Sequence, residues 1–123
     1  DLDISPEPNS SRGPADFKIS RGRDKTVIEI KLTSNKDCLH GFEVQIEEYA
    51  KSEETDNKIF IVVDNGRSSS RIKEVEESYE KRLNASEKPA TVIVIDAKPK
   101  ESASIYKPSK ATWLILLRRP VLL

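Results

Sequence analysis

The sequence has few of the residues that usually cross-link, coordinate metals or act as nucleophiles. Its 123 residues include one Cys, one His, four Gly and no Met. Cys38 cannot form an internal disulfide, which suits a reducing compartment, so we expect a cytoplasmic protein. The lone His40 gives no support to a Ser-His-Asp or Cys-His catalytic scheme. The absence of Met, with Asp1 as the first residue, predicts a fragment or processed piece of a longer protein.

Long apolar runs and net charge are also missing. The longest apolar run, Trp113 to Leu117, is far shorter than the roughly 20 residues that a membrane-spanning helix needs. Charged residues make up 34% of the chain and the net charge is zero, which is unusual for a protein that holds nucleic acid by long-range attraction alone. Charge is nevertheless segregated: residues 32–57 carry two basic and seven acidic side chains, and residues 97–123 carry six basic and one acidic. A basic face is therefore still compatible with the neutral sum.

Hydrophobic periodicity predicts alternating strands and helices in one domain. We expect strands at Ala15–Ser20, Lys25–Leu32, Lys58–Val63 and Thr91–Ile95, a helix from about Asp37 to Ser52, and a second helix capped by Ser68–Ser70 with the stripe Ile72, Val75, Tyr79 and Leu83. The first two strands form a hairpin. The last two are continuously apolar, which is typical of strands buried on both faces. Asp37 is the expected N-cap of the first helix.

This order of elements predicts an α/β fold with a partly parallel sheet. Residues 1–13 are expected to be an irregular lead-in, residues 14–97 the core domain, and residues 98–123 a basic linker followed by an apolar tail. Two interpretations of the tail segment, residues 112–123, stay open. It could be an edge strand or a segment that covers the core, or an exposed apolar strip that docks a second subunit or another part of the parent protein.

Three short runs in a fixed order carry the chemistry. They are Gly13-Pro14-Ala15-Asp16, Glu29-Ile30-Lys31, and the pair Gln45 and Tyr49. Asp16 and Glu29 could meet across the hairpin. Lys31 projects on the same face as Glu29 because side chains alternate along a strand, and Ile30 between them keeps its backbone carbonyl available. Mg²⁺ prefers oxygen ligands, usually one or two carboxylates, and a neighbouring Lys can orient water, so the pattern predicts a metal-dependent phosphodiesterase site.

The combination resembles the PD-(D/E)XK nuclease superfamily, whose two motif halves correspond to Pro14-Ala15-Asp16 and Glu29-Ile30-Lys31. Ala15 separates Pro14 from Asp16, whereas these residues are more often adjacent. The Gln45-x-x-x-Tyr49 spacing resembles the additional motif of the lambda-exonuclease and RecB-like branch. The resemblance implies a restriction-endonuclease-like core, with a mixed central sheet flanked by helices in the order αβββαβ. Only residues 1–13 precede the hairpin here, so the first helix of that core is expected to be missing or to belong to a part of the parent protein outside this sequence.

The resemblance also assigns roles. It implies that Asp16, Glu29 and the backbone carbonyl of Ile30 bind Mg²⁺ or Mn²⁺, and that Lys31 is the catalytic cation. Gln45 and Tyr49 become accessory or substrate-binding residues. The implied activity is hydrolysis of DNA phosphodiester bonds, by an endonuclease or exonuclease domain of a larger DNA-processing or defence protein. DNA is the expected partner, with a second copy of the chain or other domains of the parent protein as further partners.

Other interpretations of the same residues stay open. The fold could be a catalytically inactive nuclease-like module for nucleic-acid binding or assembly, as the zero net charge and the missing helix favour. A junction-resolving dimer of the same superfamily ranks lower, because such proteins usually present a more basic surface. Tyr49 also continues an apolar helical stripe and could be a core residue. Cys38 is interpreted as structural, and the acidic residues Glu43, Glu47, Glu48, Glu53 and Glu54 as an exposed helix face.

Overall fold

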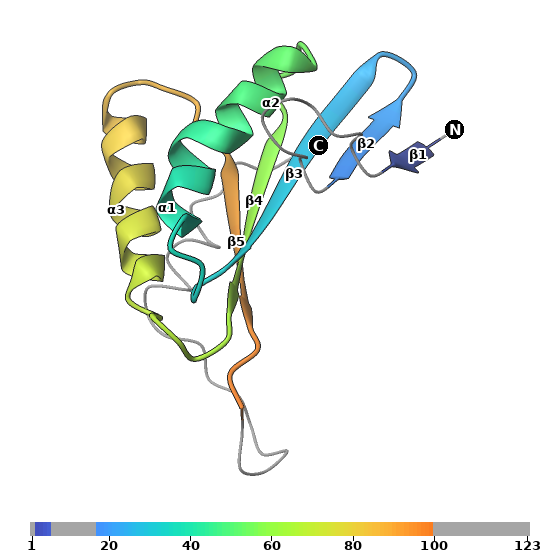
Figure 1. Cartoon of the computed structure of the whole chain (residues 1–123). Coiled ribbons are helices and arrows are strands. Elements are labelled where there is room, and N and C mark those ends of the chain that lie inside the picture. Colours follow the sequence, from blue (N-terminus) through green and yellow to red (C-terminus); the bar gives the residue numbers. More distant parts are fainter. Residues whose placement is uncertain (1, 6–16, 100–123) are drawn as a thin grey trace.

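The computed structural model describes residues 2–5 and 17–99 (Figure 1). Its elements are β1 (Leu2–Ser5), β2 (Phe17–Arg21), β3 (Asp24–Leu32), α1 (Cys38–His40), the π-helical turn η1 (Gly41–Gln45), α2 (Ile46–Ser52), β4 (Lys58–Asp64), α3 (Arg71–Asn84) and β5 (Thr91–Asp96). The four predicted strands and both predicted helices are therefore confirmed within the described residues. Asp16 and the tail segment lie outside them. Among the described helices, none has both the length and the apolar character needed to cross a membrane.

The five strands form one mixed sheet in the order β1-β2-β3-β4-β5. The first three strands are antiparallel neighbours. The helical segment α1-η1-α2 then connects β3 to the parallel strand β4, and α3 connects β4 to the parallel strand β5. This arrangement confirms the predicted α/β class with a partly parallel sheet.

The expectation of an irregular lead-in is wrong for residues 2–5. They form strand β1, which pairs with β2 so that Leu2 lies opposite Arg21 and Ser5 opposite Lys18. The cause is tertiary, because a four-residue edge strand takes its backbone hydrogen bonds from its neighbour. The surrounding Pro, Ser and Asn residues dominate the composition of this stretch and conceal the short alternation.

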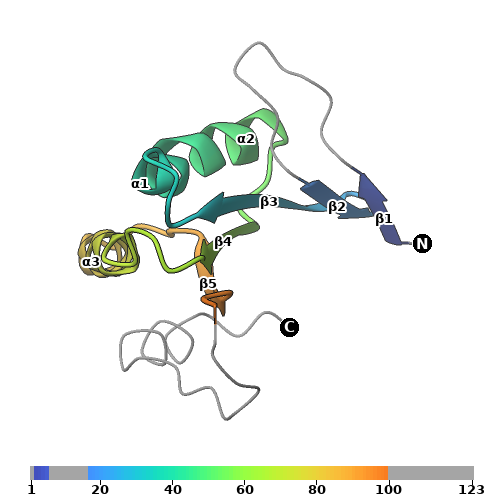
Figure 2. The same cartoon turned by 60° about the horizontal axis from the view of Figure 1, so that its bottom comes forward.

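One face of the sheet carries the hydrophobic core. Figure 2 shows α1 and α2 lying over β3. The core combines alternate strand residues with one face of each helix: Val27, Phe60, Val62, Val92, Cys38, Phe42, Ile46, Ala50, Ile72, Val75 and Tyr79. The rings of Phe42 and Phe60 meet edge to face, with centroids 5.5 Å apart. The core therefore fixes how the helices sit above the strands.

The other face of the sheet is less covered than predicted. Along β4, the residues on the helix side are buried, whereas Ile59, Ile61 and Val63 are half-buried, and Ile95 of β5 is exposed. The prediction that β4 and β5 are buried on both faces is therefore wrong. The described helices supply only one layer, and a strand needs a layer on each side to be buried twice.

Two details of the helices also differ from expectation. Asp37 makes no side-chain capping hydrogen bond; instead its backbone N–H donates to Oδ1 of Asn35, at 2.9 Å. On α3, Leu83 is 40% exposed and Ser78 takes its place among the buried residues. The Ser78 hydroxyl is buried because it donates to Oε2 of Glu43 at 2.6 Å, which satisfies its polar group.

Candidate functional site

Glu29 and Lys31 form a buried charged pair at the end of β3. Both side chains lie on the helix-covered face, since Glu29 is the register partner of the core residue Phe60 and Lys31 that of Val62. Nζ of Lys31 lies 3.2 Å from Oε1 of Glu29. Glu29 is only 2% exposed, and the Lys31 side chain is 15% exposed. The expected same-face geometry of the acid-x-lysine run is confirmed.

Gly41 allows the helix to lie directly on Lys31. A Cβ at Gly41 would stand 2.9 Å from Cε of Lys31 and 3.1 Å from the ring of Phe60. Real Cβ contacts are essentially never shorter than 3.0 Å, so a larger residue would displace the lysine stem. Sequence reasoning missed Gly41. The available signal was a glycine inside a helical pattern, which costs about 1 kcal/mol relative to Ala and often marks a close approach.

Gln45 stands at the end of the π-helical turn. The backbone N–H of Ile46 donates to the carbonyl of Gly41, five residues earlier, which closes the wide turn. Such turns inside α-helices often occur at functional sites. Gln45 is half-buried, and its Oε1 atom is buried without a hydrogen-bond partner among the described residues. A buried amide oxygen left in this state is an acceptor for a ligand or water donor.

Tyr49 is half-buried one turn after Gln45 and packs against the hydrophobic core. Its position therefore serves the core as well as the predicted accessory role. His40, at the end of α1, is exposed, in agreement with the expected surface position. Ile30 lies between Glu29 and Lys31, and its side chain points to the opposite face of the sheet.

The predicted metal ligands are represented in the described part of the chain by Glu29 and Ile30, since Asp16 lies outside it. Within residues 2–5 and 17–99, no three His, Cys, Asp or Glu side chains gather closely enough to hold a metal ion. Mg²⁺ commonly uses only one or two protein carboxylates and completes its shell with water and substrate phosphates. The buried Glu29 carboxylate is an oxygen ligand of the type that Mg²⁺ and Mn²⁺ prefer.

Cys38 lies at the start of α1 and is completely buried. Burial raises the pKa of its thiol, and the positive charges of Arg71 and Lys31 offset this only in part. The thiol is therefore protonated near neutral pH, which disfavours nucleophilic chemistry. This environment supports the structural interpretation of Cys38.

A second polar cluster surrounds Asp64 at the carboxyl end of β4. Oδ1 of Asp64 accepts hydrogen bonds from the Ser69 hydroxyl at 2.7 Å and the Gly66 N–H at 3.0 Å. Nζ of Lys98 lies 3.6 Å from Oδ2. Burial alone would raise the pKa of Asp64, but these donors and the lysine charge hold it below the ordinary value. The cluster is built from turn residues that satisfy one another, which agrees with leaving Asp64 outside the predicted site.

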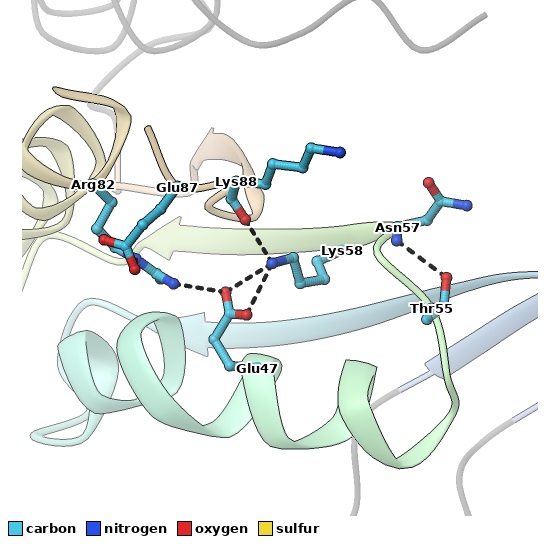
Figure 3. Close-up of polar contacts among 7 residues, drawn as sticks. All are labelled: Glu47, Thr55, Asn57, Lys58, Arg82, Glu87 and Lys88. Carbon is cyan, nitrogen blue, oxygen red and sulfur yellow. Dashed lines mark hydrogen bonds and ion pairs between the residues drawn. The ribbon is translucent and has the colours of Figure 1, made fainter. Parts of the chain in front are cut away.

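A third network ties α2 to β4 and α3 (Figure 3). Nζ of Lys58 donates to both carboxylate oxygens of Glu47, at 3.0 and 2.8 Å, and to the Lys88 carbonyl at 2.6 Å. Arg82 donates to Oε1 of Glu47 at 3.1 Å. The Lys58 side chain is only 8% exposed. The interpretation of Glu47 as part of an exposed acidic face is therefore wrong: its carboxylate neutralises two partly buried cations from other elements.

The structure thus defines an α/β domain with a mixed five-stranded sheet and a buried Glu-Lys pair beneath a π-helical turn. Residues 1–67, more than half of the chain, match the family model described as Domain of unknown function (DUF8371), so the chain belongs to that family. The matched region contains β1 to β4 and all the predicted site residues. No curated protein and no solved structure matches the chain.

Proposed function

We propose that this chain is a metal-dependent DNA nuclease domain of the PD-(D/E)XK type, from a larger DNA-processing or defence protein. The observation that carries the proposal is the Glu29–Lys31 pair, with its 3.2 Å separation on one face of β3. The antiparallel strands β1 to β3, followed by a helical crossover to parallel β4, agree with the expected core. A free, buried Cys38 agrees with a cytoplasmic location.

The register of the hairpin supports a role for Asp16. Phe17 lies opposite Ile28 in the antiparallel pair of β2 and β3. Continuing this register by one residue would bring Asp16 opposite Glu29 and onto the same face. Two carboxylates would then share one pocket as metal ligands, with the ammonium group of Lys31 beside them, which is the arrangement that the motif requires.

In this proposal each side chain has a defined task. Asp16, Glu29 and the Ile30 carbonyl would hold the cation, and Lys31 would orient the attacking water and stabilise negative charge on the phosphate as the bond breaks. Gly41 keeps the lysine stem in place, and Gln45 offers its buried amide to substrate or water. A bound Mg²⁺ would supply Lewis-acid polarisation and lower the pKa of water. The water would lose a proton and attack phosphorus in line, the opposite P–O bond would break, and the leaving oxygen would take up a proton from solvent, without a covalent enzyme intermediate.

Cleavage assays with matched variants test this proposal. The full chain is incubated with linear, circular and single-stranded DNA, with Mg²⁺, Mn²⁺ or EDTA. We expect divalent-metal-dependent products, and a loss of about 10²-fold or more for Lys31→Met and for Glu29→Gln. Lys31→Met keeps the stem that packs under Gly41, and exposed Lys73→Met is the matched control. Cleavage that survives both site substitutions would refute the assignment.

A catalytically inactive nuclease-like module is the second candidate. The observation that favours it is the zero net charge of the chain, which is unusual for a protein that holds nucleic acid by long-range attraction. This candidate predicts DNA binding or assembly without cleavage under any metal condition, and no divalent-ion heat in calorimetry. Metal-dependent cleavage that is lost with Lys31→Met, together with weaker metal binding in Asp16→Ala, would exclude it.

A further inference from the structure

The sheet face opposite the helices carries an uninterrupted apolar patch. The parallel register of β3, β4 and β5 places two rows of three aliphatic side chains across this face: Ile30, Ile61 and Ile93 in one row, and Leu32, Val63 and Ile95 in the next. We call these six residues the helix-free face. The buried apolar side chains of the described helices all belong to the core on the other side. None of these six positions is charged.

The side chains of the helix-free face are more exposed than is usual for a contiguous group of aliphatic residues on a soluble domain. Leu32 and Ile95, at its two corners, are each 46% exposed, and the other four residues are half-buried. Contiguous apolar patches on soluble domains usually mark a surface that another element covers. We therefore expect another apolar segment or subunit to cover the helix-free face.

The area of the patch favours a short segment over a second copy. Three strands spaced about 4.8 Å apart and two rows about 7 Å apart give a footprint on the order of 200 Å². A stable dimer needs about 800 Å² from each partner. One short apolar segment is enough to cover the helix-free face, and the chain itself contains such a segment.

We propose that the tail segment, residues 112–123, docks on the helix-free face and forms the second apolar layer of the sheet. The sequence of the tail segment, T-W-L-I-L-L-R-R-P-V-L-L, holds eight aliphatic or aromatic residues and no acidic residue. Removing these apolar side chains from water is favourable, and docking would bury them together with the helix-free face within one chain. This proposal does not rest on the nuclease assignment.

The connection between the two surfaces is long enough. The described chain ends at Pro99, just after β5, at the same end of the parallel strands as Leu32, Val63 and Ile95. The twelve residues from 100 to 111 can span about 40 Å when extended, which exceeds the width of the face. Tethering through such a connection gives an effective concentration on the order of millimolar, which favours docking within one chain.

Trp113, the sole tryptophan, makes the proposal testable in the chain of 123 residues. A nitroxide label is attached to Ile95→Cys on the helix-free face, or to Leu83→Cys on α3 as the control. The two positions match in exposure, at 46% and 40%, and the native Cys38 is completely buried and so protected from labelling. We expect the label at position 95 to remove most of the Trp113 emission and the label at position 83 to leave it nearly unchanged. Urea should abolish the difference.

Two further measurements separate the possible partners. Ile115→Asp in the tail segment should shift Trp113 emission toward that of the unfolded chain while far-ultraviolet circular dichroism stays unchanged. A labelled Ile95→Cys chain that also carries Trp113→Phe should not quench unlabelled chains mixed with it. Quenching in this mixture would show that a second copy occupies the face and would overturn the proposal. Equal quenching from positions 95 and 83, or none from position 95, would also overturn it.

Discussion

The buried pair at the end of β3 gives the most informative prediction, because stability and activity respond to it differently. Lys31→Met removes the ammonium group and keeps the stem under Gly41. Glu29→Gln removes the negative charge with little change in shape. The two substitutions and their combination form a double-mutant cycle, which isolates the interaction energy of the pair.

The geometry of the pair determines how large the changes in the free energy of unfolding should be. At 3.2 Å, the gross attraction is about 5 kcal/mol for an effective dielectric constant of ~20, before the cost of desolvation is subtracted. Lys31→Met leaves a carboxylate that is 2% exposed without its ammonium partner, and we expect a loss of about 3 kcal/mol in the free energy of unfolding. Glu29→Gln should cost about 1–2 kcal/mol, because the lysine is 15% exposed and can reach water.

The double variant should therefore be about 2 kcal/mol more stable than the sum of the single effects predicts. Urea unfolding followed by far-ultraviolet circular dichroism measures all four proteins. DNA cleavage should be lost in all three variants, including the double variant whose stability partly recovers. A coupling energy near zero would refute the pairing inferred from the structure, and recovery of cleavage in the double variant would refute its catalytic role.

Three further substitutions test other parts of the structure. Gly41→Ala should add about 1 kcal/mol to the free energy of unfolding through helix propensity and remove about 2–3 kcal/mol through overpacking on Lys31. The variant should therefore be less stable than wild type, and a net stabilisation in urea unfolding would contradict the close contact. Glu47→Ala should lower the free energy of unfolding by about 2–3 kcal/mol, because Lys58 loses its carboxylate partner. The control Glu77→Ala, at an exposed position, should change it by no more than about 0.5 kcal/mol. Equal effects of the two substitutions would contradict a stabilising role for the Glu47 network. Since the folded-state pKa of Asp64 is lowered, its carboxylate stabilises the fold above the ordinary pKa, and this contribution is lost as pH falls through the lowered value. The stability difference between wild type and Asp64→Asn should thus narrow as the pH falls from about 5 through and below the ordinary aspartate pKa of about 3.9. A constant difference would contradict the linkage.

Local periodicity was enough to predict most of the fold. Alternation along β3 placed Glu29 and Lys31 on one face, because the side-chain period of a strand is fixed at two residues. Continuous apolar runs located β4 and β5, and helical spacing located α2 and α3. Each of these patterns lies within a single segment of the sequence. It can therefore be recognised without knowing which other elements pack against that segment.

Features that depend on distant partners could not be predicted. Strand β1 exists because β2 offers it an edge, and the sequence of residues 2–5 does not contain that edge. The role of Glu47 depends on Lys58 and Arg82, which are 11 and 35 residues away. The π-helical turn at Gly41 likewise accompanies packing against Lys31 on another element. Sequence patterns predict element type, whereas these contacts arise only when the elements meet.

The central claim is that Asp16, Glu29 and Lys31 share one divalent-cation pocket. The most direct measurement is an NMR titration of the full chain with Mn²⁺, which broadens the backbone amide signals nearest to the bound ion. We expect selective broadening at Glu29, Ile30, Lys31 and the residues around Asp16, and loss of this effect in Glu29→Gln. Broadening confined to an acidic surface such as Glu76 and Glu77 of α3, or broadening unchanged in Glu29→Gln, would contradict it.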